Sequence, residues 1–308
     1  MSRRVTASKV SLARHCLAPW TSHIAWAKTA STQANVGTAF HKWPEIVIAA
    51  GGQAPMNPSA YVEQLPDITE DLRPLLLRLI LAWEIHWRAC RSLVGWSAEV
   101  AYAYDPQTGE ARELGSGLQR DYSGAKAGEM AMTMDARNMS DGALIIDWKT
   151  GKQANAERAK DHGQGKLLAL AVARAHGLDA VAFEIVHVAT TGITVDRALY
   201  DGFALDDYAE ELRDIDCRVR AGQQEPNPGT HCHSLWCPIV AGCPAAAPNP
   251  WDIRRDTLEV LRTCGPLSLR HIASTLSIRE EQLSPILAGL VANHEVGIEK
   301  GIVRRVRS

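Results

Sequence analysis

The segment from Met130 to Gly151, MAMTMDARNMSDGALIIDWKTG, constrains the fold of this chain more than any other. Residues 131–136 alternate between apolar and other side chains, a pattern typical of a strand. Residues 143–147 begin as a continuous apolar run, which is typical of a strand buried on both faces. The Asp141-Gly142 pair between them is a signal for a tight hairpin turn. The sequence therefore predicts two neighbouring strands, each with an aspartate at or near its end.

A lysine follows the second of these aspartates in the order Asp147-Trp148-Lys149. Asp147 and Lys149 are two residues apart, so on an extended chain both side chains point the same way. Together with Asp135 on the neighbouring strand they form a candidate metal site, because Mg²⁺ and Mn²⁺ prefer carboxylate oxygens. The lysine could then face a phosphate or an attacking water. A short motif of this kind also occurs as plain surface charge, so other segments have to support the interpretation.

The order of these residues resembles a known family. Asp135 followed by the segment Asp147-Trp148-Lys149-Thr150-Gly151 is similar to motifs II and III of the PD-(D/E)XK nucleases, particularly their RecB-like branch. The resemblance implies an α/β, restriction-endonuclease-like fold, in which a mixed β-sheet core is flanked by helices. It also implies metal-dependent hydrolysis of DNA. In that reaction Asp135 and Asp147 would be catalytic ligands of Mg²⁺ or Mn²⁺, and Lys149 would be a further catalytic residue.

Two further residues match motifs of the RecB-like branch. The segment Gly37-Thr38-Ala39-Phe40-His41 resembles the G-x(3)-H form of motif I, which implies that His41 is a third metal ligand. Without that resemblance, a single histidine is more often structural or exposed. Gln164 resembles the glutamine of a Q-x(3)-Y motif on the helix after D-x-K, which implies a catalytic role in positioning the strand. Leu168 stands where that motif has tyrosine, so the match is incomplete there.

Three of the seven cysteines are clustered between residues 232 and 243. Their soft thiolates suit zinc or an iron–sulfur cluster, and His231 and His233 would also allow a zinc site. The odd number of cysteines, and the lack of a secretory signal in MSRRVTASKV, argue against a disulfide framework. The three clustered residues are Cys232, Cys237 and Cys243.

An upstream cysteine completes a second resemblance. Cys16 and the three clustered cysteines are similar to the iron–sulfur staple of AddB-type exonucleases. The resemblance implies a 4Fe-4S cluster that ties the two ends of the nuclease domain together, held by Cys16, Cys232, Cys237 and Cys243. The spacing here is C-x(4)-C-x(5)-C, whereas the family uses C-x(2)-C-x(5)-C. Zinc (Zn²⁺) is the alternative occupant.

The distribution of charge gives a weak sign of nucleic-acid binding. The formal net charge is −2, but no aspartate or glutamate precedes Glu45. Arg120 and Lys126, in the glycine-rich stretch 114–128, could contact phosphates or could simply be solvated. Glu99, on a predicted strand, could approach the metal or could be an exposed strand residue.

Hydrophobic patterning predicts helices and further strands around this centre. Helical patterns cover residues 7–30, 68–93, 153–176 and 203–221, with a break expected at Pro19 in the first of them. Strand patterns cover residues 97–104, 180–189 and 192–195. Trp83 and Trp87 lie four residues apart on the second of these helices. At that spacing, packing in the core is a more common role than stacking on nucleobases.

The last part of the chain is predicted to form a separate domain, so that residues 1–248 are the nuclease domain and residues 249–308 the second domain. Helical patterns cover residues 252–264, 268–276 and 280–293, and a hairpin pattern covers residues 296–306. This order resembles a winged helix. Arg279 and Gln282 are the candidate base-reading residues, whereas the acidic Glu280 opposes insertion into DNA. A protein-contact module of the same shape is the rival interpretation.

These features predict a metal-dependent DNA nuclease, expected to be an exonuclease, that acts in DNA repair, recombination or phage-related processing. No GxxxxGK[ST] motif is present, so a helicase or recombination protein would have to unwind the DNA. No apolar run approaches the ~20 residues needed to cross a bilayer, and we expect a cytoplasmic, bacterial or phage-encoded protein with no membrane partner. Two alternatives stay open. One is a catalytically silent nuclease-fold scaffold that binds DNA, and the other is a zinc-bound winged-helix regulator.

Overall fold

The computed structural model describes residues 5–24, 26, 32–90, 94–117, 121–140, 142–150, 157–223, 226–227, 232, 237–240, 243, 250–276 and 280–306. The chain divides into two compact units, Met1–Asn227 and Pro228–Ser308. Each unit has its own hydrophobic core. The predicted domain boundary between residues 248 and 249 lies outside the described residues, and it stays a prediction.

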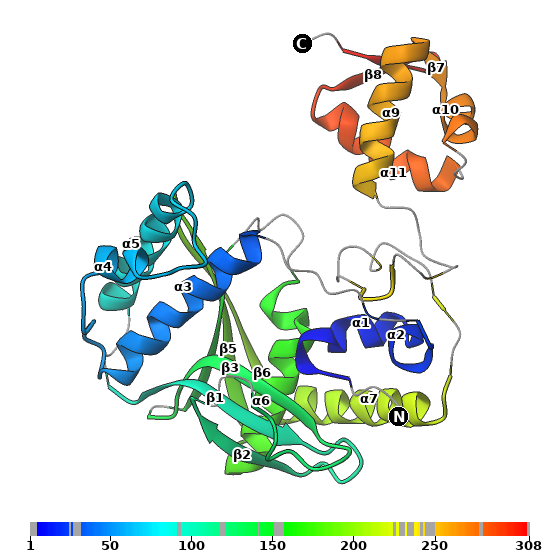
Figure 1. Cartoon of the computed structure of the whole chain (residues 1–308). Coiled ribbons are helices and arrows are strands. Elements are labelled where there is room, and N and C mark those ends of the chain that lie inside the picture. Colours follow the sequence, from blue (N-terminus) through cyan, green and yellow to red (C-terminus); the bar gives the residue numbers. More distant parts are fainter. Residues whose placement is uncertain are drawn as a thin grey trace. The chain divides into compact units, whose positions relative to one another are not determined.

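The first unit is built on a six-stranded mixed sheet with the order β2-β1-β3-β4-β5-β6 (Figure 1). Its strands are β1 (Trp96–Tyr104), β2 (Ala111–Ser116), β3 (Met130–Asn138), β4 (Ala143–Thr150), β5 (Ala180–Ala189) and β6 (Gly192–Asp201). Strands β4 and β5 are parallel, and all other neighbours are antiparallel. A parallel pair needs a crossover connection, which the chain supplies as a helix between β4 and β5. The predicted mixed α/β core is therefore confirmed.

Helices cover both faces of this sheet (Figure 1). One face carries α3 (Thr32–Ala49), α4 (Pro58–Glu63) and α5 (Arg73–Cys90), and the other carries α1 (Val10–His15), α2 (Ala18–Thr21), α6 (Gly163–His176) and α7 (Gly202–Arg220). Short 3₁₀ turns, η1 (Ala7–Lys9) and η3 (Ala159–Asp161), precede α1 and α6. In the described part of the chain, no helix is both long and apolar enough to span a bilayer.

Three segments differ in detail from the sequence patterns. The helical pattern over residues 7–30 is broken at Pro19 as expected, and Pro19 is an early residue of the new helix α2. The glycine-rich stretch 114–128, which no strand pattern covers, contains the end of strand β2, which pairs along β1. The strand predicted over residues 192–195 extends to Asp201, because β6 pairs with β5 along its whole length. That long-range pairing outweighs the low strand propensity of the charged residues in β6.

A tryptophan cluster fixes the orientation of β4. Trp83 and Trp87 of α5 stack with ring centroids 5.2 Å apart, and both pack edge-on against Trp148 of β4. All three side chains are buried, so Trp83 and Trp87 pack in the core and are not available for stacking on bases. Because alternate strand residues point to opposite faces, Asp147 and Lys149 are turned to the face that α6 covers.

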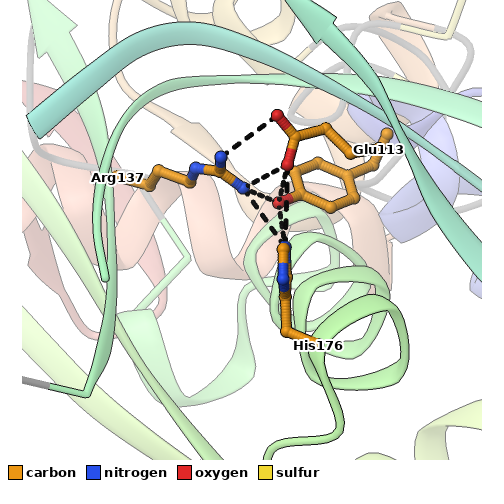
Figure 2. Close-up of polar contacts among 4 residues, drawn as sticks. Glu113, Arg137 and His176 are labelled. Atoms are coloured by element: carbon orange, nitrogen blue, oxygen red, sulfur yellow. Dashed lines mark hydrogen bonds and ion pairs between the residues drawn. The ribbon is translucent and has the colours of Figure 1, made fainter. Parts of the chain in front are cut away.

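A polar cluster holds the C-terminal end of α6 on the sheet (Figure 2). Arg137 of β3 donates two hydrogen bonds to Glu113 of β2, of 2.8 and 3.1 Å. The Tyr102 hydroxyl of β1 contacts both Glu113, at 3.2 Å, and Nε2 of His176, at 2.8 Å. One helix end is thereby tied to three strands, and Gly177 closes the helix in the left-handed conformation.

Within its described residues, the second unit has the helices α9, α10 and α11 and a small antiparallel sheet with the order β7-β9-β8. Its elements are α9 (Pro250–Cys264), β7 (Leu267–Ser268), α10 (Leu269–Thr275), α11 (Glu280–Ala292), β8 (Val296–Glu299) and β9 (Ile302–Arg305). Ser268 caps α10, since its side chain accepts a hydrogen bond from the backbone N–H of His271 at 3.3 Å. The element order matches the predicted one with β7 added, and the winged-helix relationship and its ligand stay predictions.

Candidate active site

Asp135 lies where strands β3 and β4 separate. The two strands pair only over Ala136–Asn138 and Leu144–Ile146. Just beyond that stretch, Oδ2 of Asp135 accepts a hydrogen bond from the backbone N–H of Trp148 at 2.7 Å. The carboxylate thus satisfies a backbone donor that the sheet no longer pairs. This contact fixes Asp135 beside the D-x-K segment of β4.

Asp147 and Lys149 form an ion pair on the α6 face of β4. The Nζ atom of Lys149 lies 2.7 Å from Oδ2 of Asp147, whose side chain is only 6% exposed. The same Oδ2 has this ion pair but no hydrogen bond from any described residue. A buried carboxylate oxygen with charge compensation but no hydrogen bond is unusual. It marks a position at which a cation would be stabilised.

Helix α3 brings His41 to this site. Gly37, one turn before His41, lies so close to Thr150 at the end of β4 that an added Cβ would be 3.3 Å from the threonine Oγ1. This close approach sets Nδ1 of His41 3.1 Å from Oδ1 of Asp135. Burial acts to lower the pKa of His41, but the charge of Asp135 and its hydrogen bond outweigh burial and raise that pKa. Burial acts to raise the pKa of Asp135, and His41 in turn holds it below its usual value.

Two histidines that the sequence analysis did not select also line the site. His187 of β5 lies opposite Lys149 in the parallel ladder. Burial, and after it the charge of Lys149, lower the pKa of His187. His162 is the N-cap of α6, and its Nδ1 accepts a hydrogen bond from the backbone N–H of Gly165 at 3.1 Å. The sequence pattern does not single out His162 as a helix cap, because it predicts a helix from residue 153, whereas α6 begins at Gly163.

Side chains from β6 and α7 hold the segment that leads into α6. The backbone N–H of Ala159 donates to Oδ2 of Asp196 at 2.9 Å, and the Tyr200 hydroxyl donates to the carbonyl of the same alanine. The Tyr208 hydroxyl of α7 donates to the Gly163 carbonyl at 2.8 Å. These contacts fix the position at which α6 starts.

The other predicted site residues lie apart from this centre or outside the described residues. Gln164 is half-buried in the first turn of α6, and its side chain has no hydrogen bond with the part of the chain that is described. Lys126 is exposed in the loop before β3, and Gln282 is half-buried in α11 of the second unit. Arg120 and Arg279 lie outside the described residues.

The cysteines are divided between the two units. Cys16 follows α1 in the first unit, where it is half-buried. Cys232 and Cys237 are buried in the second unit, where Cys243 is half-buried. The backbone N–H of Cys237 donates to the carbonyl of Cys232 at 3.1 Å. His231 and His233 lie outside the described residues.

The side chains at this site are of the chemical type that binds a divalent metal ion. Asp135 and Asp147 supply the hard carboxylate oxygens that such ions prefer, and one buried oxygen of Asp147 lacks a hydrogen bond within the described structure. Among the described residues, no three His, Cys, Asp or Glu side chains already have a metal-binding arrangement. The reason is visible at the site, because His41 and Lys149 face the oxygens that an ion would use.

The chain matches a known protein family over most of its length. A family model described as the PD-(D/E)XK nuclease superfamily matches residues 4–244. No curated protein matches the chain. A solved structure described as "Crystal structure of SSO0001" aligns with 78% of this chain and 96% of its own, at 13% identity and a TM-score of 0.32. Structural likeness at that level carries no argument about this chain.

Proposed function

The chain belongs to the PD-(D/E)XK nuclease superfamily over residues 4–244, and from this premise we propose that it is a Mg²⁺- or Mn²⁺-dependent deoxyribonuclease. The observation that carries the proposal is the grouping of Asp135, Asp147 and Lys149 where β3 and β4 separate. Two carboxylates that can hold a metal ion, with a lysine beside them, suit metal-assisted phosphodiester hydrolysis. The substrate in this proposal is DNA.

In the proposed reaction each residue has a separate role. Asp135 and Asp147, with His41 beside them, would hold the ion. The bound ion supplies a water of lowered pKa and neutralises the charge that builds up on the phosphate. Lys149 donates to the attacking water or to a phosphate oxygen. Gln164, in the first turn of α6, contacts the strand and helps to position it.

The experiment that tests this proposal compares two lysines of similar setting. Lys149 and Lys42 are 41% and 42% exposed, and each lies 2.7 Å from a carboxylate oxygen. We expect Lys149→Ala to lower DNA cleavage in Mn²⁺ or Mg²⁺ by about 10²-fold or more, whereas Lys42→Ala cleaves like the wild type. EDTA should abolish cleavage by both active proteins. Normal cleavage by Lys149→Ala would show that the mechanism is wrong.

We propose exonuclease action in DNA repair, recombination or phage-related processing, with a helicase or recombination protein as partner. The distinction from endonuclease action is measured with end-labelled linear DNA and covalently closed circular DNA. An exonuclease degrades only the linear form, and nicking of the circle would contradict this part of the proposal.

The iron–sulfur cluster on Cys16, Cys232, Cys237 and Cys243 is a further part of the proposal. It is supported by the end of the first unit, where the Asn227 side chain donates to the carbonyl of His15 at 2.8 Å. The chain therefore returns to the neighbour of Cys16 only five residues before Cys232. Protein purified without air should be coloured and contain iron, and Cys16→Ser should lose both properties. Cys264→Ser, at an exposed cysteine, is the control, and colourless protein with stoichiometric zinc would favour Zn²⁺.

A DNA-binding scaffold without cleavage is the second candidate function. It is favoured by Leu168, a fully buried residue where the related motif has tyrosine, and by the engagement of both aspartates with His41 and Lys149. DNA binding without cleavage in Mg²⁺ and in Mn²⁺ would support the scaffold over the nuclease.

A further inference from the structure

His162 occupies a defined position at the start of α6. Its ring stacks on Phe183 of β5, with centroids 5.5 Å apart and an interplanar angle of 16°. Phe183 pairs with Ile145 on β4, two residues before Asp147 and on the same face of the sheet. The side chain is therefore next to the proposed catalytic residues, and the charges of Asp147 and Lys149 both act on it.

The helix cannot move away from this position easily. Gly165 lies directly on the ring of Phe183, and an added Cβ at residue 165 would come within 2.3 Å of it. Asp196 accepts from the backbone N–H of Ala159, and the Tyr208 hydroxyl donates to the carbonyl of Gly163, so both hold the start of the helix and the segment before it. The first turn of α6 and the His162 ring are thus seated as one rigid piece on β5.

The hydrogen bond to Gly165 decides which ring nitrogen of His162 carries a proton. A backbone N–H can only donate, so Nδ1 of His162 must accept and must have its lone pair free of hydrogen. Burial lowers the pKa of His162, which agrees with a neutral ring. In a neutral ring that accepts at Nδ1, the hydrogen is on Nε2.

This tautomer limits what His162 can bind. An Nε2 atom that carries hydrogen has no lone pair for a metal ion, so His162 differs from His41 and is not a ligand while the cap is intact. Nε2–H is instead a donor, and within the described residues its ring makes no hydrogen bond besides the one with Gly165. The acceptors that a nuclease site brings to such a donor are the phosphate oxygens of the bound strand.

We propose that His162 is a positioning residue that donates its Nε2–H to a non-bridging phosphate oxygen of the DNA strand bound at Asp135 and Asp147. The inference rests on the proposed nuclease function and adds a substrate contact to it. It also explains why a histidine, rather than the more usual serine, threonine or aspartate, caps α6. A histidine ring can fill both roles, because Nδ1 caps the helix while Nε2–H donates to the phosphate oxygen.

Two substitutions of His162 separate its role as the helix cap from its role as a hydrogen-bond donor to DNA. His162→Asn retains an acceptor near the position of Nδ1, and asparagine is a good N-cap, but the variant has no group at the position of Nε2. His162→Gln places an amide N–H the same number of bonds from Cα as Nε2, and it lacks the short acceptor that caps the helix. A structural role and a DNA-contact role therefore predict opposite rankings of these two variants.

The experiment measures three quantities for each variant. These are the thermal midpoint, the affinity for a fluorescent oligonucleotide in EDTA, and the KM and kcat for cleavage in Mn²⁺. We expect His162→Asn to keep the thermal midpoint of the wild type while its DNA affinity falls and its KM rises by about tenfold. His162→Gln should have a lower midpoint but closer to wild-type affinity. His176→Asn, at the other end of α6, is the control for the loss of a helix-terminal histidine and should bind DNA like the wild type.

The inference is overturned if His162→Asn binds DNA and cleaves with the wild-type KM, or if affinity follows thermal stability across the variants. Binding in EDTA tests it even when no protein cleaves. A wild type that binds DNA and does not cleave contradicts the proposed nuclease alone. A wild type that fails to bind DNA contradicts both the proposed function and the role of His162.

Discussion

Asp135 and Asp147 share one site, but they are neutralised by different groups from different parts of the chain. His41 of α3 faces Asp135, and Lys149, two residues away on the same strand, faces Asp147. Asp135 also accepts a backbone hydrogen bond, whereas the buried Oδ2 of Asp147 has none among the described residues. At the scale of single residues, Asp147 is therefore the carboxylate whose buried oxygen is charge-compensated but lacks a hydrogen bond.

The first prediction concerns metal binding by Asp147. A ligand that binds only the folded state stabilises it by an amount that grows with concentration, about 2.7 kcal/mol at a hundred times Kd. We expect Mn²⁺ in that excess to raise the thermal midpoint of the wild type by about 5 °C or more, and Asp147→Asn to lose most of this rise. Differential scanning fluorimetry in Mn²⁺ and in EDTA measures it.

The control for this prediction is Asp206→Asn. Asp206, on α7, forms an exposed ion pair with Arg174 of α6. That variant should keep the Mn²⁺-dependent rise. An undiminished rise in Asp147→Asn would mean that the ion binds elsewhere.

At the scale of elements, α6 is held at both ends by side chains from the sheet. Its first turn lies on Phe183 and is capped by His162, while His176 at its last turn joins the cluster of Tyr102, Glu113 and Arg137 in Figure 2. A crossover helix fixed in this way fixes the groups beside it. The site therefore depends on how closely α6 approaches β5.

The second prediction tests that approach with a pair of glycines. Gly165→Ala would place a Cβ within 2.3 Å of the Phe183 ring, so we expect a loss of about 1–3 kcal/mol in the free energy of unfolding. Gly289→Ala in α11 meets nothing within 4 Å and should stabilise its helix by up to about 1 kcal/mol, because alanine has the higher helix propensity. Urea unfolding followed by circular dichroism gives both values. Equal changes in the free energy of unfolding for the two substitutions would contradict the close packing of α6 on Phe183.

The third prediction concerns pH and the element boundary before β3. Arg112 of β2 donates to both oxygens of Glu129, at 3.2 and 2.8 Å, and these hydrogen bonds hold the pKa of Glu129 below its usual value, although burial acts to raise it. A carboxyl with a lowered folded-state pKa stabilises the protein above its unfolded-state pKa of about 4.3. That stabilisation is lost as the pH falls through this value and then through the lower folded-state value.

We expect Glu129→Gln to be less stable than the wild type at pH 7, with the difference shrinking as the pH is lowered toward 3. Urea unfolding at several pH values measures the difference directly. If the difference in the free energy of unfolding between the two proteins stays constant with pH, the charge of Glu129 does not contribute to stability.

At the scale of the whole molecule, the chain consists of two units with separate cores. All of the described residues assigned to the proposed catalytic centre belong to the first unit. The family match over residues 4–244 covers that unit and the cysteine cluster. The second unit is therefore predicted to add binding rather than chemistry.

The fourth prediction follows from this division. A chain that ends at residue 248 should fold, keep its metal-dependent cleavage of a short oligonucleotide, and lose DNA affinity only if the second unit contacts DNA. Cleavage rates and binding of the two chains on the same oligonucleotide measure this. An unfolded or inactive shorter chain would contradict the independence of the first unit.

The D-x-K motif and its strand could be predicted from the sequence because they depend on local rules. Strand alternation turns Asp147 and Lys149 to one face and Trp148 to the other, whatever the rest of the chain does. The same holds for the Ser268 cap and for the C-terminal hairpin. Information within a few residues is sufficient for such features.

Only the tertiary structure decided which distant groups meet at the site. The contact of His41 with Asp135 depends on the close approach of Gly37 to Thr150, and the seat of His162 depends on Phe183. The extent of β6 and the late start of α6 likewise follow from pairing and packing with remote residues. These contacts join residues far apart in the sequence, and their free energy comes from burial and close packing, which no local pattern of side chains encodes.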